Sequence, residues 1–297
     1  MSKKETLDQE TRNARSSGGS GIELSAREFE MFRSYIYEKS GINLHDGKRE
    51  LVRTRLGSRL RALDLATYRD YFEYVRDDRS EQELVNMLDA ISTNLTSFFR
   101  EINHFTFLEQ KVIPELLRRR EKGEREIRAW SAGCSSGEEP YSIAFLLATR
   151  MPDGAANDIK ILATDLSTRA LGKAAKGVYS EEQVKTVPPD MRKQWLTTVV
   201  DEYGDKRSQV APAIRKIVKF NRFNLMTPRF PFRRTFSFIF CRNVMIYFDK
   251  PTQETLVNKY YDVLAKGGYL FIGHSESLTG VKHGFRYVQP TIYQKPA

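Results

Sequence analysis

The chain has 297 residues, with 48 Lys and Arg against 38 Asp and Glu, and a formal net charge of +10. A hydrophobic content of 40% is ordinary for a globular protein and argues against overall disorder, and the length favours one large domain plus a smaller one. The positive charge predicts an anionic partner, but charge alone does not choose among nucleic acid, a membrane surface and an acidic protein.

Residues 1–22 read as a flexible tail, because they contain the run Ser-Ser-Gly-Gly-Ser-Gly and almost nothing apolar. No apolar run there is long enough for a signal peptide or a membrane span, so we expect a cytoplasmic protein. The two cysteines, Cys134 and Cys241, are too few for a disulfide framework or a CxxC zinc site. They end strands that we expect to be neighbours, but a reducing compartment favours free thiols.

Residues 23–85 are predicted to form a helical N-terminal domain. Ser25 can cap a first helix that Gly41 ends, and a second helix begins near Asp46. Further helices are predicted from Thr67 and Glu81. At about 100° per residue, one face of the second helix is apolar, and its border carries basic side chains. The apolar positions are Val52, Leu56, Leu60 and Leu63, and the basic ones include Lys48, Arg55 and Arg59.

Residues 86–297 change to an alternation of short apolar runs and helical stretches. The runs are residues 127–130, 159–163, 236–240 and 269–272, and the helical stretches are residues 142–150, 168–176 and 251–264. This pattern predicts a parallel sheet covered on both faces, that is, a Rossmann-like α/β domain. Residues 180–223 interrupt the alternation. We expect there an inserted helix and a small antiparallel β-subdomain at about residues 195–222, with β-rich segments 196–200 and 217–220.

The loop after the first strand predicts a cationic ligand. It contains Gly133 and the pair Glu138-Glu139, and a helix follows directly. The GxGxxG spacing of dinucleotide sites is absent, and the two carboxylates stand where a pyrophosphate would bind. S-adenosylmethionine, with its ammonium and sulfonium groups, fits such a loop better. The alternative is that both glutamates only favour the helix dipole.

Polar residues also follow the second and fourth strands. A carboxylate such as Asp165, at the end of the second strand, usually accepts hydrogen bonds from a ribose diol, although it can instead cap the next helix. Arg242, Asn243 and Tyr247 follow the fourth strand, at the edge of the sheet where ligands bind. The Asn/Asp-Pro-Pro-aromatic segment typical of nucleic-acid base methyltransferases is missing there.

Three segments together resemble the CheR family of chemotaxis receptor methyltransferases. They are Thr-Asn-Leu-Thr-Ser-Phe-Phe-Arg-Glu at residues 93–101, Gly-Glu-Glu-Pro-Tyr-Ser-Ile at 137–143 and Phe-Cys-Arg-Asn-Val-Met-Ile-Tyr-Phe-Asp at 240–249. Gly-His-Ser-Glu-Ser at 273–277 is similar as well. The resemblance covers residue 25 to the C-terminus. It implies a helical N-terminal domain, a Rossmann-like catalytic domain and a small inserted β-subdomain.

The resemblance also implies an activity and its residues. The expected reaction transfers a methyl group from S-adenosylmethionine to glutamate carboxylates of chemotaxis receptors, giving methyl esters and S-adenosylhomocysteine. Arg100 and Tyr247 are the implied catalytic residues. A glutamate side chain, with a pKa of about 4.3, is already ionised and needs no general base. The implied cofactor-binding residues are Asn94, Thr96, Arg100, Gly133, Glu139, Asp165, Asn224, Leu225, Arg242 and Asn243.

The implied protein partner is the helical cytoplasmic region of the receptor, and the membrane is reached only through it. Its acidic surface fits a basic face made of Lys48, Arg49, Arg53, Arg55 and Arg59, whose alternative role is a solvated charged face. In some family members the β-subdomain binds a receptor tether. Residues 199–210 here depart from the glycine-richer loop of those members, so tether binding does not follow.

Two other classes of function remain open from the residues alone. A nucleic-acid methyltransferase fits the net charge but not the segment after the fourth strand. A non-catalytic module that senses S-adenosylmethionine fits the loops but leaves Arg100 and Tyr247 without a role. A nicotinamide dehydrogenase ranks below both, because the glycine spacing is absent.

Overall fold

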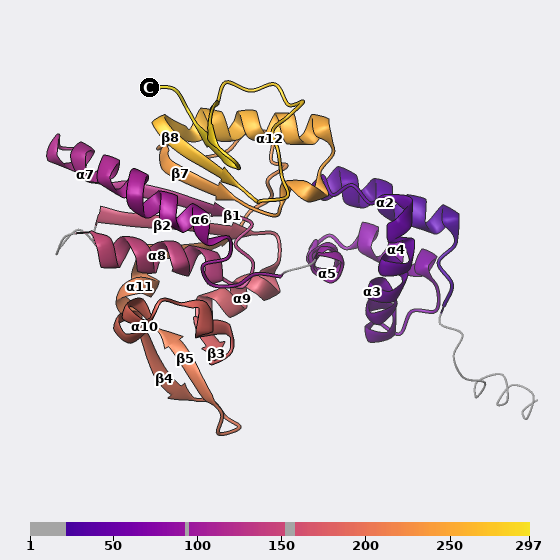
Figure 1. Cartoon of the computed structure of the whole chain (residues 1–297). Helices are drawn as coiled ribbons and strands as arrows, with labels where there is room; N and C mark the ends of the chain where they lie inside the picture. Colours follow the sequence, from indigo (N-terminus) through magenta and orange to yellow (C-terminus); the bar gives the residue numbers. More distant parts are fainter. Residues whose placement is uncertain (1–21, 93–94, 152–157) are drawn as a thin grey trace, which may run out of the picture. The chain divides into compact units, whose positions relative to one another are not determined.

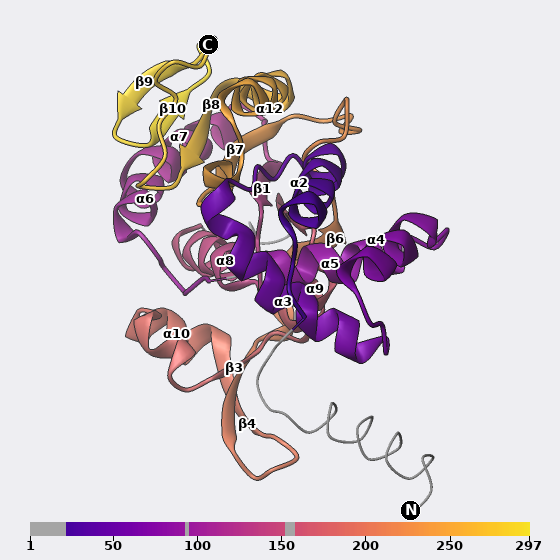
Figure 2. The same cartoon turned by 90° about the vertical axis from the view of Figure 1, so that its right-hand side faces the viewer.

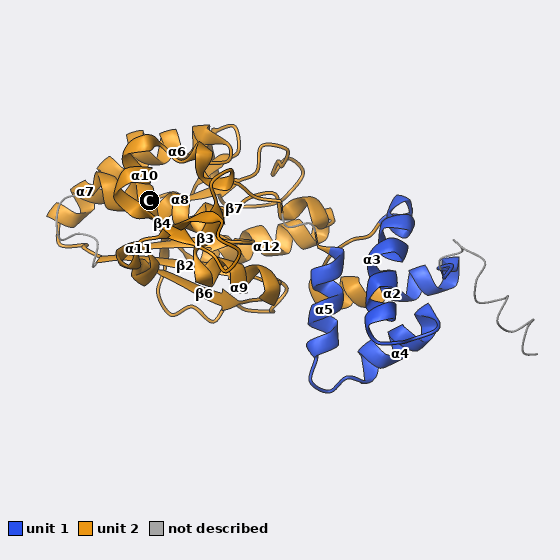
Figure 3. Ribbon diagram, turned by 90° about the horizontal axis from the view of Figure 1, so that it is seen from below, with its two compact units in different colours: residues 1–32, 45–91 blue, residues 33–44, 92–297 orange. Residues whose placement is uncertain are grey.

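The computed structural model describes residues 22–92, 95–151 and 158–297. Contacts divide the chain into two compact units (Figure 3). Unit 1 comprises residues up to 32 and 45–91, and unit 2 comprises residues 33–44 and 92–297. Apart from Ile22, the predicted tail lies outside the described residues. The domain boundary predicted between residues 85 and 86 falls inside a helix, and by contacts the division comes after Ile91.

Unit 1 is built from helices whose starts follow local capping signals. The Ser25 hydroxyl accepts the Glu28 N–H at 3.2 Å while the Glu28 carboxylate accepts the Ser25 N–H at 2.8 Å, which is a capping box. Phe32 is fully buried and lies against the aromatic rings of Tyr68, Tyr71 and Phe72 in the helix 68–77. The elements are α2 (Ala26–Ser40), which continues into unit 2, η1 (Asp46–Lys48), α3 (Arg49–Ala62), α4 (Tyr68–Asp77) and α5 (Gln82–Ile91).

Unit 2 contains, among its described residues, a seven-stranded sheet in the order β6-β2-β1-β7-β8-β10-β9. The strands from β6 to β8 are parallel, while β10 and β9 run antiparallel at one edge. Their bounds are β1 (Ile127–Ala132), β2 (Ile159–Asp165), β6 (Val218–Arg222), β7 (Phe236–Cys241), β8 (Leu264–Ile272), β9 (Arg286–Gln289) and β10 (Ile292–Gln294). The four strands expected from apolar runs are all present in this sheet.

Helices cover the sheet. In Figure 1, α12 lies beside β7 and β8, and contacts place α8, α9 and α11 against β1, β2 and β6. Between them lies a core of buried aliphatic and aromatic side chains, with Phe238, Phe240 and Phe271 from the central strands. The helices are α6 (Ile102–Phe107), η2 (Leu108–Val112), α7 (Ile113–Glu121), α8 (Glu138–Arg150), α9 (Thr168–Lys176), η4 (Gln183–Thr186), α10 (Pro189–Trp195), α11 (Pro212–Ile217), η5 (Met245–Tyr247) and α12 (Lys250–Val263).

The inserted β-subdomain differs from its predicted bounds. A three-stranded antiparallel sheet, in the order β3-β5-β4, is made of β3 (Val178–Ser180), β4 (Leu196–Val200) and β5 (Lys206–Val210). Figure 2 shows this hairpin extending away from the main sheet. The segment 217–220, predicted to flank it, instead belongs to β6 of the main sheet and pairs in parallel with β2. The reason is that α11 turns the chain back, so Val218 is buried against the core.

The helices in residues 22–92, 95–151 and 158–297 are each too short or too polar to cross a bilayer.

Candidate active site

A cavity with about 940 Å³ of open space lies in unit 2, where β1, β2 and β7 end. Segments far apart in the sequence line it, from the end of α2 to the turn after β7. Its predicted residues are Thr96, Arg100, Gly133, Glu139, Asp165, Asn224, Leu225, Arg242, Asn243 and Tyr247. Asn94 lies outside the described residues. The sheet topology thus brings the predicted cofactor positions that can be described to one place.

The loop after β1 needs a glycine at its first position. Gly133 has φ +92°, and a Cβ atom there would lie 2.3 Å from Cγ2 of Val244, which is too close for any other residue. The N–H groups of Gly133 and Cys134 both donate to the carbonyl oxygen of Thr164, at 2.8 and 2.9 Å. These contacts hold the loop against the end of β2 and let its backbone border the cavity.

Asp165 is held by two backbone groups. Its Oδ2 accepts the N–H of Ser135 at 2.8 Å, and its Oδ1 accepts the N–H of Ser167 at 2.9 Å. These two bonds orient the carboxylate at the edge of the cavity. The alternative role, capping the next helix, belongs to Ser167, whose hydroxyl accepts the N–H of Ala170.

The two adjacent glutamates have different surroundings. Glu139 lines the cavity, where its Oε1 accepts the Ser131 hydroxyl at 2.6 Å and its Oε2 lies 3.3 Å from Arg242 Nη1. Burial raises the pKa of Glu139 above its usual value of 4.5, and the Arg242 guanidinium opposes that rise. Glu138 is not among the lining residues and bonds to Ser136 and Gln183. Glu139 is therefore the carboxylate that can meet a cation.

Arg242 joins the segments around the cavity. It is only 5% exposed, and its Nη2 lies 3.1 Å from Glu101 Oε2 while its Nη1 faces Glu139. It also donates to the backbone oxygen of Arg100. Burial works to raise the pKa of Glu101, but Arg242 and the backbone N–H of His274 outweigh it, so that pKa lies below its usual value.

The turn after β7 is held by a buried carboxylate that sequence reasoning did not single out. Glu276 accepts the N–H groups of Asn243 at 3.0 Å, Ile246 at 3.1 Å and Gly273. Asn243 has φ +57°, and these bonds keep it there. The sequence did hold a clue to Glu276, because this residue lies in the Gly-His-Ser-Glu-Ser segment that resembles the CheR family. Burial raises the pKa of Glu276.

The implied catalytic residues both line the cavity. Arg100 follows two buried phenylalanines, and its Nη1 donates to the carbonyl oxygen of Leu95 at 2.8 Å. Tyr247 is half-buried at the end of η5, and its backbone oxygen accepts the N–H of Asn43 at 2.8 Å. Among the described lining residues there is no histidine.

The side chain of Asn224 has a structural task. Its Nδ2 donates to the Lys39 carbonyl at 2.7 Å, and its Oδ1 accepts the Met226 N–H at 2.9 Å. These bonds connect the loop after β6 to the end of α2. Ser40, the last residue of α2, and Ile42 just after it also line the cavity. No local pattern pointed to those two residues, because a chain reversal brings them there.

The basic residues predicted to meet a receptor lie in unit 1, and three of them are engaged inside it. Arg55 Nη1 donates to the Ile91 carbonyl at 2.6 Å, and Arg59 pairs with buried Glu83 at 2.7 Å. Arg49 donates to the Leu24 carbonyl. Lys48 is exposed, and Arg53 pairs with Glu50 on the surface.

Cys134 and Cys241 are free thiols, 1% and 0% exposed. Burial raises the pKa of both thiols, so neither is a reactive thiolate.

Comparison with known proteins agrees with this geometry. The CheR methyltransferase SAM-binding domain matches residues 94–294, and the CheR methyltransferase all-alpha domain matches residues 27–92. A chemotaxis protein methyltransferase of Borreliella burgdorferi is 40% identical over 276 residues, covering 92% of this chain and 96% of the relative.

Two further relatives are similar over most of their length. A probable chemotaxis protein methyltransferase of Rhizobium etli is 43% identical over 87% of this chain and 96% of its own. The chemotaxis protein methyltransferase of Escherichia coli is 35% identical, with 92% of each chain covered.

The cavity fits the cofactor that the matched domain binds. Glu139 could meet an ammonium group, Asp165 ends β2 where a carboxylate in this kind of fold usually meets a ribose diol, and Gly133 would admit close approach of a ligand to the backbone. This chain thus belongs to the CheR methyltransferase family, and its cofactor is S-adenosylmethionine.

Proposed function

We propose that the enzyme methylates side-chain carboxylates of glutamates on chemotaxis receptors, giving methyl esters. The supporting observation is the composition of the cavity, which joins Glu139 and Asp165 with Arg100 and Tyr247 and has no histidine among its described lining residues. An acceptor that is already ionised at neutral pH needs no base, and a glutamate carboxylate is such an acceptor. The relatives' names, chemotaxis protein methyltransferases, support the same substrate class.

When bound, S-adenosylmethionine supplies an electrophilic methyl group on a sulfonium. A carboxylate oxygen of the acceptor bonds to that methyl carbon while the carbon–sulfur bond breaks, so no proton is transferred. Arg100 and Tyr247 would hold the acceptor in line, and such alignment is in general worth roughly 7–11 kcal/mol. Tight ion pairing with Arg100 would stabilise the ground state, so orientation is the role we assign to it.

The proposed partner is the acidic helical cytoplasmic region of a receptor. Exposed Lys48, at the end of η1, and exposed Arg61 on α3, with the partly exposed Arg53, are the cations best placed to meet it. Arg49, Arg55 and Arg59 contribute positive charge, but their guanidinium groups already have partners inside unit 1.

The test is transfer of labelled methyl groups from S-adenosylmethionine to receptor-containing membranes. Mild alkali should release the label from a receptor band as volatile methanol, because methyl esters are base-labile. Label that survives alkali would contradict ester formation. Label on added RNA would favour a nucleic-acid methyltransferase, and cofactor binding without transfer would favour a sensing module.

Tyr247→Phe tests the orienting role within the same assay. It should lower kcat by about 10²-fold with little change in cofactor affinity, because misalignment affects the transfer step. Tyr203→Phe is the matched control, since Tyr203 is 83% exposed at the β4–β5 turn. If Tyr247→Phe has the same kcat as Tyr203→Phe, the Tyr247 hydroxyl does not orient the acceptor.

A further inference from the structure

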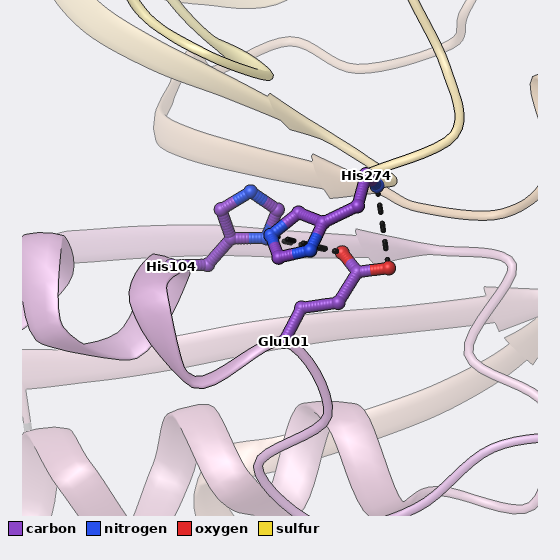
Figure 4. A group of neighbouring side chains, drawn as sticks. All are labelled: Glu101, His104 and His274. Atoms are coloured by element: carbon purple, nitrogen blue, oxygen red, sulfur yellow. Dashed lines mark hydrogen bonds and ion pairs between the residues drawn. The ribbon is translucent and has the colours of Figure 1, made fainter.

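Three titratable side chains from two segments meet (Figure 4), and one of them, Glu101, contacts Arg242. They are Glu101 before α6, His104 within α6 and His274 after β8. Glu101 Oε2 lies 3.5 Å from His104 Nδ1 and 3.9 Å from His274 Nε2, and one ligand atom from each residue lies within 4.8 Å of the others. None of the three lines the cavity, and the proposed reaction uses none of them.

One tautomer of His104 leaves a lone pair on Nδ1. Its Nε2 lies 2.7 Å from the Thr291 hydroxyl oxygen, and that hydroxyl can donate its single hydrogen to the Pro290 carbonyl at 2.6 Å. In that tautomer Nε2 donates to Thr291 and Nδ1 carries the lone pair. Nδ1 is buried and has no hydrogen-bond partner in the part of the chain that the structure describes. It faces the Glu101 carboxylate, which is itself an acceptor.

The groups that now contact Glu101 hold it loosely. Arg242 Nε and Nη2 lie 3.3 and 3.1 Å from Oε2, and Asn243 Nδ2 and the His274 N–H lie 3.4 and 3.2 Å from Oε1. Charge-assisted hydrogen bonds are usually about 2.7–2.9 Å long. In this tautomer His104 Nδ1 and the Glu101 carboxylate are two acceptors that face each other at 3.5 Å, a contact that a bound cation would bridge.

We propose that Glu101, His104 and His274 form a binding site for a divalent transition-metal ion of the zinc class. Two imidazoles and one carboxylate are a known zinc ligand set, with a water in the fourth position. Bonds of about 2.0–2.2 Å in tetrahedral geometry place ligand atoms roughly 3.3–3.6 Å apart. The Glu101–His104 separation of 3.5 Å already matches this, and a turn of the His274 ring would bring its Nε2 in from 3.9 Å. The His274 side chain is 46% exposed, so its ring can turn and an ion can enter.

The site predicts an inhibitory effect on cofactor binding, an inference that rests on the cofactor cavity described above. The ion takes the Glu101 oxygen that Arg242 contacts, and it adds positive charge next to a residue that lines the cavity. S-adenosylmethionine is itself cationic, so the ion and the cofactor should weaken each other's binding. By thermodynamic linkage, the weakening factor is the same in both directions.

Cobalt(II) provides a test that does not depend on methyl transfer. The full chain, without a histidine tag, is titrated with Co²⁺, and the visible absorption of a tetrahedral site is followed until Zn²⁺ displaces it. We expect one Co²⁺ per chain and no thiolate charge-transfer band, because both cysteines are buried. His274→Ala should abolish the spectrum and keep the fold, since the Glu101 contact of residue 274 comes from its backbone N–H.

The matched control is His45→Ala, an exposed histidine before η1, which should retain the cobalt spectrum. In a second measurement, Zn²⁺ should raise the Kd of S-adenosylmethionine for the wild type and for His45→Ala, but not for His274→Ala. A wild type without a tetrahedral spectrum, or a His274→Ala variant that keeps it, would overturn the site. Equal Kd values with and without Zn²⁺ would overturn the antagonism alone.

Discussion

The two neighbouring glutamates of α8 show how environment separates adjacent residues. Burial raises the pKa of both Glu138 and Glu139. The Glu138 carboxylate accepts hydrogen bonds from Ser136 and Gln183, whereas Glu139 lies at the cavity wall beside Arg242. The same residue type thus holds a loop at one position and lines the cavity at the next.

The first prediction is that Glu139→Gln weakens binding of S-adenosylhomocysteine. A hydrogen bond to a charged group is worth about 1.5–3 kcal/mol, so the Kd measured by calorimetry should rise roughly 10- to 100-fold. Glu138→Gln is the matched control. Because Glu138 does not line the cavity and bonds to Ser136 and Gln183, the neutral amide there should leave the Kd almost unchanged. A larger loss for Glu138→Gln would reverse the assignment.

The second prediction concerns pH. The pKa of Glu139 lies above 4.5, and only the ionised form attracts the ammonium group of the ligand. Affinity should therefore be complete above that raised pKa and should fall by about tenfold for each pH unit below it. Calorimetry between pH 4.5 and 8 measures this profile. In Glu139→Gln the dependence should be flat, and an equally steep profile in that variant would exclude Glu139 as its origin.

At the scale of elements, α3 carries two kinds of basic residue. Arg59 binds buried Glu83, which also accepts the Tyr71 hydroxyl at 2.8 Å, and Arg55 contacts the carbonyl groups that end α5. These contacts hold α3, α4 and α5 together. Lys48, which ends η1 just before α3, and Arg61 are exposed, and neither joins α3 to another helix among the described residues.

A third prediction separates these two kinds of residue. Arg59→Ala should lower the free energy of unfolding of the chain by about 2–3 kcal/mol, because it leaves a buried carboxylate with fewer partners. The double variant Lys48→Ala, Arg61→Ala should leave stability unchanged and raise the KM for receptor but not for cofactor. Thermal unfolding and methyl-transfer kinetics measure the two effects. An unchanged KM for receptor in the double variant would show that Lys48 and Arg61 are solvated surface charges without a role in receptor binding.

At the scale of the whole molecule, the division into units does not follow sequence order. Residues 33–44 belong to unit 2, although unit 1 resumes after them. Tyr37 donates to Asp249 at 2.9 Å, the Lys39 carbonyl accepts from Asn224, and the Asn43 N–H donates to Tyr247. The end of α2 is thus part of the wall around the cofactor cavity.

A fourth prediction follows for a chain cut before Ser92. Residues 92–297 should keep the sheet in circular dichroism but bind S-adenosylhomocysteine roughly tenfold more weakly or worse. They lack hydrogen bonds worth about 1 kcal/mol each to Asn224 and Tyr247, and also the wall residue Ile42. If the shortened chain does not fold, Tyr37→Phe in the full chain tests the same link, because Tyr37 joins α2 to Asp249 without lining the cavity. An unchanged Kd in both would contradict it.

The parts predicted correctly depend on local or topological rules. Apolar runs marked the four central strands, and Ser25 and Thr67 marked helix starts, because caps and strand burial act within a few residues. Parallel strands bring their carboxyl ends to one edge, so residues after those strands were expected to meet. The binding and catalytic roles of those residues stay predictions for the experiments above.

By itself, the sequence determined the α/β class, the order of the four central strands and of the helices between them, and, through its motifs, the family. Only the tertiary structure decided that residues 217–220 join the main sheet, that Arg55 and Arg59 face inward, and that Ser40 and Ile42 line the cavity. The reason is physical. A side chain's partner across dozens of residues depends on which surfaces the chain buries together, and one segment's pattern of polar and apolar residues is compatible with several partners.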